Sequence, residues 1–334
     1  NRNKRSLAVN LKSAAGRSVF MRLVAQADVL AENYRQGVMT KLGLDYATLE
    51  KVRPELVYAS ISGFGQDGPW SDRPGFDLMA QAMSGVMSVT GHPGGPPVKA
   101  GVPVADIGCA LFAAYAILSA YIGRLKSGRG QYIDASLFDS VLAFAIWDVA
   151  DYWGTGRVPT PVGTSNKMAA PYQAVRAADG YLVMGATNQK LWAALCKLMD
   201  RADIVDDARF ATNAKRLAHR EALIEELEQT FTQRPAAEWI DRMLAAGIPA
   251  GPLLTYPEAF DSAHGRHREM RIEIDHPVEG QVPNIGFPVK LSATPARVRR
   301  PPPLLAEHTD EVLDELGIGA EEREALRAAG AFTP

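Results

Sequence analysis

Apolar and polar side chains follow two different periodicities over residues 1–60. Residues 13–26 carry apolar side chains at helical spacing after Ser13, a residue type that often caps helices, and a second helix ends at 49–52. Residues 6–11, 28–30 and 56–61 are predicted to be strands, because their side chains alternate or form short apolar runs. Strands that alternate with helices in this way predict a parallel sheet with crossover helices.

The pattern changes after residue 61. Residues 62–105 are rich in Gly and Pro and predict loops interrupted by one helix around 76–88. Long irregular segments inside a compact chain commonly carry function. Beyond them we expect two apolar helices at 107–126 and 136–153, a linker at 155–168, a strand at 181–184, helices at 189–199, 216–231 and 236–246, β-structure and extended chain over 270–300, and two final helices at 310–316 and 320–328.

The first apolar helix carries no charge from Ile107 to Gly123. This run is shorter than the ~20 apolar residues that span a bilayer, and it is rich in Ala, Gly and Ser. We therefore predict a helix buried in the core, with Asp106 and Arg124 flanking it, and no membrane partner.

Composition excludes several classes of protein. The 334 residues suggest about two domains at roughly 150 residues each, and 36 Lys and Arg against 38 Asp and Glu give a net charge of −2. A near-neutral chain with 47% hydrophobic residues is neither a strongly basic nucleic-acid binder nor a disordered acidic protein. Its two cysteines, Cys109 and Cys196, rule out a disulfide framework. With no signal-peptide pattern, we expect a cytoplasmic protein, or a mitochondrial or peroxisomal one in a eukaryote.

Some familiar catalytic patterns are missing from the sequence. It contains no Gly-x-Ser-x-Gly elbow and no GxxxxGK[ST] phosphate loop. His264 and His267 have the spacing of two metal ligands on a helix, but no further ligand accompanies them, so we predict a solvated basic turn and no metal site. Cys109 lies within the apolar helix, where cysteine behaves as a small hydrophobic residue.

Asp106 is the most informative candidate. It follows the Gly- and Pro-rich segment 101–105 and opens the apolar helix, where free backbone N–H groups favour an ionised carboxylate. Asp is also a preferred N-cap residue, so a purely structural cap is the alternative. A carboxylate held at a cleft lined by loops could instead attack an acyl group as a nucleophile.

A series of short motifs extends over nearly the whole chain. They are Asn3–Ser6 with Asn10–Lys12, Glu32–Tyr34 with Gly37 and Leu42–Gly43, Ser60–Gly65 with Gly68–Pro69, Gly75–Asp77, Asp106 with Gly128–Gln131, Pro171–Tyr172 with Asp179–Gly180, Gly247–Pro249 with Gly251–Pro252, and Pro303–Leu305 with Glu307–Thr309. In this order they resemble the family III (CaiB/BaiF) CoA-transferases, which include the formyl-CoA transferase, carnitine CoA-transferase and α-methylacyl-CoA racemase types.

The resemblance implies an α/β fold with a Rossmann-like parallel-sheet large domain, a smaller α/β domain, long linkers and an interlocked homodimer. On this basis we expect the large CoA-binding domain at 1–140 and 290–334, the small domain at 170–262, and linkers at 141–169 and 263–289. Family members usually begin with one further βαβ segment, a unit of roughly 30 residues or more, so we expect the large domain to be incomplete at its N-terminus.

The resemblance also assigns roles to residues. The family nucleophile falls on Asp106, and the CoA-contacting positions fall on Val9, Asn10, Leu11, Lys12, Asn33, Tyr34, Arg35, Lys41, Leu42, Ser62, Gly63 and Phe64. Lys12, Arg35 and Lys41 can pair with phosphates, although a solvated surface position is the alternative for each. A weaker assignment gives an oxyanion-stabilising loop on the substrate side to Gly163, Thr164, Ser165 and Asn166, which a plain interdomain linker would also explain.

The implied reaction moves CoA from an acyl-CoA resembling succinyl-CoA to a free carboxylic acid of the dicarboxylate type, through an aspartyl-CoA thioester on Asp106. It needs no permanently bound cofactor, no metal and no nucleic-acid partner. Racemase members carry a His at the position of Phe76, and a phenyl ring cannot exchange a proton, which disfavours racemisation. An acyl-CoA racemase and an inactive CoA-binding fragment are the alternatives.

Overall fold

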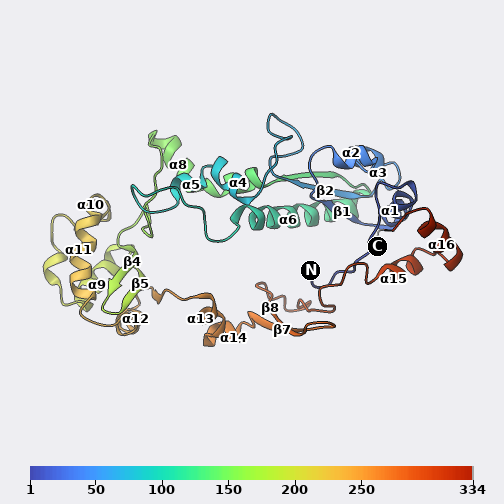
Figure 1. Ribbon diagram of the computed structural model, residues 1–334. Coiled ribbons are helices and arrows are strands. Elements are labelled where there is room, and N and C mark those ends of the chain that lie inside the picture. The colour runs from blue at the N-terminus through green and yellow to red at the C-terminus, as the bar shows by residue number, and fades with distance from the viewer. Residues whose placement is uncertain (333–334) are drawn as a thin grey trace. The chain divides into compact units, whose positions relative to one another are not determined.

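The computed structural model describes residues 1–332, and the chain divides into two compact units (Figure 1). Unit 1 consists of Asn1–Ser88, Lys99–Pro159 and the chain from Glu269 on, and unit 2 consists of Val89–Val98 and Thr160–Arg268. The residue bounds predicted for functional domains and linkers stay a prediction.

A three-stranded parallel sheet forms the centre of unit 1. It consists of β1 (Val29–Glu32), β2 (Val57–Ser62) and β3 (Tyr132–Ser136) in that spatial order. The predicted α/β class with a parallel sheet is confirmed. The sequence prediction omits β3, because its five residues follow a long apolar helix after only a short turn.

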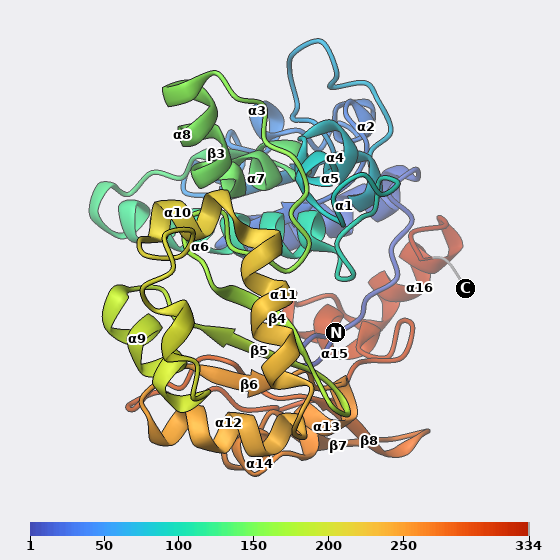
Figure 2. The ribbon, with the colours of Figure 1, turned by 90° about the vertical axis from the view of Figure 1, so that its left-hand side faces the viewer.

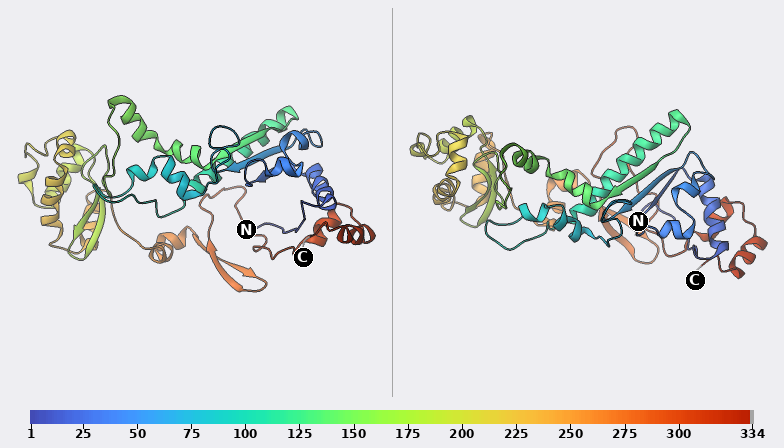
Figure 3. Two further views of the ribbon diagram at one scale, coloured as in Figure 1. Left: turned by 45° about the horizontal axis from the view of Figure 1, so that its top comes forward. Right: turned by 90° about the horizontal axis from the view of Figure 1, so that it is seen from above.

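One face of this sheet carries Leu30, Tyr58 and Tyr132, which are paired across the three strands. Three helices cover that face: α1 (Ala14–Gln26), α2 (Val38–Leu42) and α3 (Tyr46–Leu49). Side chains alternate along a strand, so Val57 and Ala59 point to the other face, where both are fully buried. The helix α6 (Val104–Ser127) runs along β2 and β3, below the strands in Figure 1 and beside them in Figure 3.

The predicted buried core helix forms, but only one side of α6 is buried. Small residues, among them Ala105, Gly108 and Ala113, face the protein because they allow close approach. The large apolar side chains point outward with exposed fractions of 49–69%; they are Ile107, Leu111, Tyr115, Leu118, Ile122 and Leu125, called here the α6 stripe. By length and composition alone α6 could also cross a membrane. The prediction of a fully buried helix is therefore wrong for this side.

The helices α4 (Asp77–Met83) and α7 (Leu137–Leu142) pack against the N-terminal part of α6. The short elements that follow them in the chain are α5 (Val86–Val89) after α4, and the 3-10 helix η1 (Ala143–Ala145) and α8 (Ile146–Thr155) after α7. Ala80 of α4, Ala105 of α6 and Val141 of α7 form a small buried core. This core fixes the start of α6 against α4 and α7.

Residues 6–11 do not form the predicted strand. They run extended beside the C-terminal part of unit 1: the His308 N–H donates to the Ser6 carbonyl (3.0 Å), and the Asn10 N–H donates to the Ala331 carbonyl (2.8 Å). The two predicted C-terminal helices, α15 (Thr309–Glu315) and α16 (Ala320–Ala328), are confirmed. Alternation of side chains alone does not make a strand when no neighbouring strand supplies a ladder.

Unit 2 holds an antiparallel sheet of β4 (Tyr172–Ala177), β5 (Gly180–Gly185) and β6 (Ala250–Pro252) (Figure 2). Its helices are α9 (Gln189–Leu198), η2 (Ala202–Ile204), α10 (Asn213–Ala218), α11 (Arg220–Phe231), α12 (Ala236–Ala245), α13 (Tyr256–Asp261) and α14 (Ala263–His267). Trp192, Phe231 and Trp239 are buried in its core. In unit 1, β7 (Arg271–His276) and β8 (Gly280–Ile285) form a separate antiparallel hairpin.

Candidate active site

Two predicted CoA-contacting segments meet at the carboxyl ends of parallel strands. Asn33–Arg35 directly follows β1, and Ser62–Phe64 spans the end of β2. The Glu32 carboxylate accepts hydrogen bonds from the Tyr34 N–H (2.7 Å) and from the Ser60 hydroxyl. Ligands of open α/β sheets commonly bind at this edge, so the topology supports a binding role for both segments.

Gln66 joins these two segments to the third strand. Its Nε2 donates to Ser60 Oγ (2.8 Å), and its N–H donates to Asp134 Oδ2 (2.8 Å) on β3. Its carbonyl accepts from Gln36 Nε2 (2.8 Å) on the loop after β1. Burial raises the pKa of the Asp134 carboxyl, and the Gln66 N–H opposes that shift.

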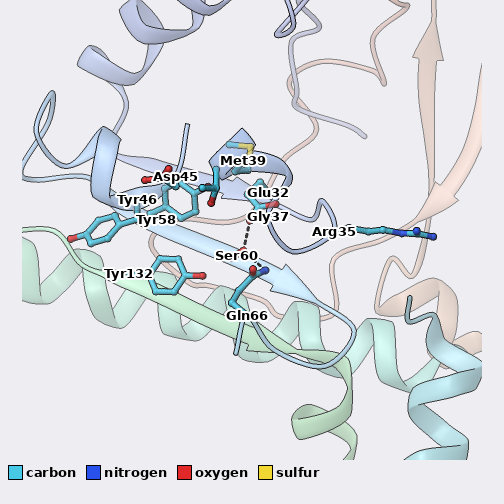
Figure 4. Close-up of a pocket in the computed structure, with 11 residues that line it drawn as sticks. Glu32, Arg35, Gly37, Met39, Asp45, Tyr46, Tyr58, Ser60, Gln66 and Tyr132 are labelled. Carbon is cyan, nitrogen blue, oxygen red and sulfur yellow. Dashed lines mark hydrogen bonds between the residues drawn. The ribbon is translucent and has the colours of Figure 1, made fainter. Parts of the chain in front are cut away.

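A pocket opens on the face of the sheet that α1, α2 and α3 cover (Figure 4). The rings of Tyr46, Tyr58 and Tyr132 form one wall, with centroids 5.7–6.0 Å apart. Apart from the apolar Met39, the remaining lining residues are polar or small, namely Glu32, Arg35, Gly37, Thr40, Asp45, Ser60 and Gln66. Burial raises the pKa of all three tyrosines, so their hydroxyls stay protonated at neutral pH. The Arg35 side chain extends away from the aromatic wall (Figure 4).

The other two predicted CoA-contacting segments also belong to unit 1. Val9–Lys12 leads into α1, and its backbone is fixed: Asn10 Nδ2 donates to the Gly330 carbonyl (3.2 Å), and Arg17 Nη1 donates to the Lys12 carbonyl (2.9 Å). Lys41 and Leu42 form the last turn of α2. The residues Lys12 and Lys41 are exposed. Exposure fits both a phosphate-binding cation and a solvated surface residue, so it does not distinguish the two roles.

A close backbone contact links the β2 loop to α4. A Cβ atom at Gly63 would lie 2.8 Å from the Cα of Gly75, so only glycine fits at this contact. Residues 63–68 also have the spacing Gly-x-Gly-x-x-Gly directly after β2. The dinucleotide fingerprint requires a helix to open there, whereas the next helix begins at Asp77.

Asp77 caps the N-terminus of α6 from a neighbouring helix. Its Oδ1 accepts from the N–H of Ala105 (2.8 Å) and, at 3.4 Å, from the N–H of Asp106. The residue at the N-cap position is Pro103, whose side chain makes no capping hydrogen bond. The alternative that Asp106 is itself the N-cap is therefore wrong. In the sequence, the signal for this role of Asp77 is a helix that begins after a proline with no capping side chain, so that the cap must come from elsewhere.

Asp106 thus lies inside the first turn of α6, and the residue is exposed to solvent. Among residues 1–332, its carboxylate makes no hydrogen bond or ion pair. Partial burial raises the pKa of the Asp106 carboxyl, and the nearby Asp77 charge raises it further. A carboxylate without partners at a helix N-terminus is free to act as a nucleophile.

The predicted oxyanion loop belongs to unit 2. The N–H of Gly163 donates to the Gly91 carbonyl (2.8 Å), that of Ser165 to the Val162 carbonyl (3.2 Å), and that of Asn166 to the Tyr172 carbonyl (2.9 Å). The Thr164 hydroxyl accepts from the Ala174 N–H (3.1 Å). Because these N–H groups already have partners, the loop offers few free donors, and its oxyanion role stays a prediction.

The remaining candidates do not form further sites in the described part of the chain. Cys109 is buried one turn beyond Asp106, and burial raises the pKa of its thiol, which fits the predicted role as a small hydrophobic residue. His264 and His267 lie in the short helix α14. Among residues 1–332, no cluster of His, Cys, Asp and Glu could hold a metal ion.

The sequence and the fold both match known proteins over most of the chain. The model of CoA-transferase family III matches residues 1–309. A mouse protein named succinyl-CoA:glutarate CoA-transferase is 37% identical over 316 residues, which cover 95% of this chain and 72% of that protein. The succinyl-CoA:mesaconate CoA-transferase of Haloarcula marismortui is 38% identical over 323 residues, covering 95% and 81%. The crystal structure of a CaiB/BaiF family protein from Brucella suis has a TM-score of 0.83 at 37% identity and covers 95% of this chain and 82% of its own.

Proposed function

The chain belongs to CoA-transferase family III, and on that premise we propose that it moves CoA from an acyl-CoA to a free carboxylic acid with Asp106 as the nucleophile. The observation that carries the proposal is the Asp106 carboxylate, which has no partner and lies in the first turn of α6. Asp77 contacts this turn, and the Gly63–Gly75 contact lies just before Asp77 in the chain. The segment Gly75–Asp77 therefore connects the proposed nucleophile to the proposed CoA-binding loop after β2.

The proposed chemistry balances without a metal, ATP or a permanently bound cofactor. The ionised Asp106 attacks the thioester carbonyl, expels CoA as the thiolate and forms a mixed anhydride. The thiolate then attacks the Asp106 acyl carbon, which releases the donor acid and leaves an aspartyl-CoA thioester. The acceptor carboxylate reacts with this thioester by the same two steps in reverse, which regenerates Asp106. A carboxylate suits the task because the overall reaction exchanges one thioester for another at near-zero net free energy.

We propose dicarboxylates as the acids and succinyl-CoA as the donor. Two of the relatives are named for succinyl-CoA together with glutarate or mesaconate. Coenzyme A would bind at the carboxyl ends of β1 and β2, with Arg35, Lys12 and Lys41 available to its phosphates. Asn33 and Tyr34, the latter 49% exposed, would contact the adenine, and the remaining members of the predicted set would line the path of the cofactor.

Racemisation is the less favoured activity. The ring of Phe76 is 69% exposed at the residue before α4, where the racemase branch has an acid–base histidine. A phenyl group neither accepts nor donates the proton that racemisation moves. Asp106 alone would leave one face of the substrate carbon without a base.

A second copy of this chain is the proposed partner of the α6 stripe. Its six large apolar side chains recur at intervals of three and four residues, which is the spacing of a self-complementary helix seam. Monomeric proteins rarely leave a continuous apolar surface of this kind in water. We therefore propose a homodimer in which this stripe is covered.

The decisive experiment traps the acyl-enzyme. The protein is incubated with succinyl-CoA, treated with borohydride or hydroxylamine, digested and examined by mass spectrometry. The expected adduct lies on Asp106, and Asp106→Ala should abolish transfer to glutarate while leaving CoA binding measurable by thermal shift. Asp241→Asn, an exposed carboxylate of α12, is the control. An adduct on another residue, or retained transfer in Asp106→Ala, would refute the mechanism.

Isotopes separate the alternatives. Oxygen-18 in the acceptor carboxylate passes through Asp106 into the donor acid during transfer. Deuterium incorporated from solvent at the carbon next to the thioester, without CoA exchange, would instead support a racemase. A thermal shift with CoA and no turnover on any acid would support a CoA-binding protein without activity.

A further inference from the structure

We propose that Gln81 is a positioning residue for this reaction: it holds the Asp77 carboxylate in the one orientation that caps α6 and thereby fixes the turn that carries Asp106. The inference rests on the proposed function for its catalytic consequence. The placement of the side chain itself does not depend on that function.

Gln81 lies one turn along α4 from Asp77 and is completely buried. Its Nε2 donates to Asp77 Oδ2 at 2.6 Å. Its Oε1 accepts from the N–H of Ala100 at 2.9 Å, in the loop that leads into α6. One side chain therefore connects α4 both to the capping carboxylate and to the loop before the helix.

The two partners of Gln81 require an amide. The Ala100 N–H needs an acceptor, and the ionised Asp77 needs a donor, so the side chain must present one of each at its two ends. Methionine has a similar length but offers neither a strong acceptor nor a donor. An ionised glutamate would satisfy Ala100 but would place a second negative charge against Asp77.

A donor to Asp77 is needed because the two carboxylates lie close together at one helix end. The titratable groups near the start of α6 are Asp77 on α4, Asp106 and Cys109 on α6 itself, Asp134 on β3, Asp139 on α7, and Lys99 in the preceding loop, whose Nζ donates to the Ala100 carbonyl (3.1 Å). Within residues 1–332, no Lys, Arg or His side chain pairs with Asp77 or Asp106. The charge on Asp77 is stabilised instead by the Gln81 amide and by the backbone N–H groups of Ala105 and Asp106. Without the amide, Asp77 would be free to rotate, and α6 would lose its cap.

The diagnostic variant is Gln81→Glu. When its new carboxyl group is protonated, the variant reproduces the amide, because the hydroxyl donates to Asp77 and the carbonyl oxygen accepts from Ala100. Ionisation removes that donor and adds a buried like charge. We expect kcat/KM of Gln81→Glu to equal that of the wild type at acid pH and to fall at least about ten-fold below it as the pH rises, because misplacement of a catalytic group by ~1 Å can cost up to 10²-fold. A merely structural substitution would lower the ratio equally at every pH, and such a constant ratio would overturn the proposal.

One further measurement, hydrogen–deuterium exchange, separates this inference from the proposed function. Hydrogen–deuterium exchange over residues 99–106 should accelerate in Gln81→Met, because the N–H groups of Ala100 and Ala105 lose their partners. In Gln81→Glu it should accelerate only at the higher pH and at Ala105 rather than Ala100, because the ionised carboxylate repels Asp77 but still accepts from Ala100. Gln229→Glu, which adds one charge to α11 in unit 2, should leave exchange and turnover unchanged. If the wild type transfers no CoA, the proposed function fails, and the exchange data still decide the role of Gln81. Unchanged exchange in Gln81→Met would overturn it.

Discussion

The close contact between Gly63 and Gly75 makes a sharp prediction for Gly63→Ala. The added methyl carbon would lie 2.8 Å from the Cα and 3.3 Å from the N of Gly75. Carbon atoms in contact rest about 3.5–4.0 Å apart, so the two backbones must separate by about 1 Å. Because both partners are backbone atoms, no flexible side chain can move aside.

The expected cost of Gly63→Ala follows from this geometry. Overpacking of this kind typically costs about 1–3 kcal/mol of stability. The displaced Gly75 lies close before Asp77, which caps α6, so the Asp106 carboxylate should move with it. A shift of ~1 Å at a catalytic group lowers turnover by as much as 10²-fold. We expect both losses in the same variant.

The assay for Gly63→Ala combines urea unfolding, CoA titration and transfer kinetics. Trp70 reports on this region, because its ring lies 6.0 Å from that of Phe64 and 5.5 Å from that of Phe138. Gly154→Ala in α8 is the matched control: its Cβ meets nothing within 4 Å, so it should stabilise by about 0.5–1 kcal/mol. Gly75→Ala should reproduce the defect of Gly63→Ala from the other side. Wild-type unfolding and turnover in Gly63→Ala would refute the role given to this contact.

Three further predictions concern charge and assembly. Asp77→Asn should move the acid limb of the pH–rate profile to lower pH, because the Asp77 charge raises the pKa of the Asp106 carboxyl and its removal lowers that pKa; a limb that stays in place or moves upward in a pH series would contradict this. Leu111→Glu with Leu118→Glu should convert a dimer to a monomer in sedimentation, whereas a wild type that is monomeric, or that partitions into lipid vesicles, would exclude a second copy as the partner of the α6 stripe. Arg5→Ala should lower the urea midpoint by an amount equivalent to about 1 kcal/mol or less, since its pairs with Glu311 and Glu315 are partly exposed, and the loss should shrink at high salt.

Local patterns predicted much of the fold. Ser13 accepts a hydrogen bond from the Gly16 N–H at the start of α1, as its residue type and position predict. β1 and β2 coincide with apolar runs, and α9 and α12 coincide with the predicted helices at 189–199 and 236–246. These elements were predictable because their signals lie within a few neighbouring residues. The predicted single helix at 216–231 is wrong in its bounds, because the chain there forms α10 and α11 with a break at His219.

The errors arise where the decisive partner is distant in the sequence. Residues 6–11 have the alternation of a strand, yet their backbone pairs with segments about 300 residues away. The short strands β3 and β4 form because they pair with β2 and β5, and their own composition does not reveal this pairing. Likewise, the cap of α6 comes from Asp77 on another helix, and a single helix pattern cannot reveal it. The position of Asp106 in the sequence marks it as a candidate nucleophile, but only the structure shows that Asp77, and not Asp106, caps α6.

The pairing of the N-terminal segment with residues beyond 300 also constrains how the protein is made. Unit 2 is complete once residue 268 has been synthesised, whereas unit 1 draws on chain from both sides of it. On the ribosome, unit 2 can therefore fold as soon as it emerges. The extended residues 6–11 and the face of α1 that carries Val19 must wait for α15 and α16. During that interval unit 1 exposes an apolar surface, the kind of surface that makes an incompletely folded chain prone to aggregation.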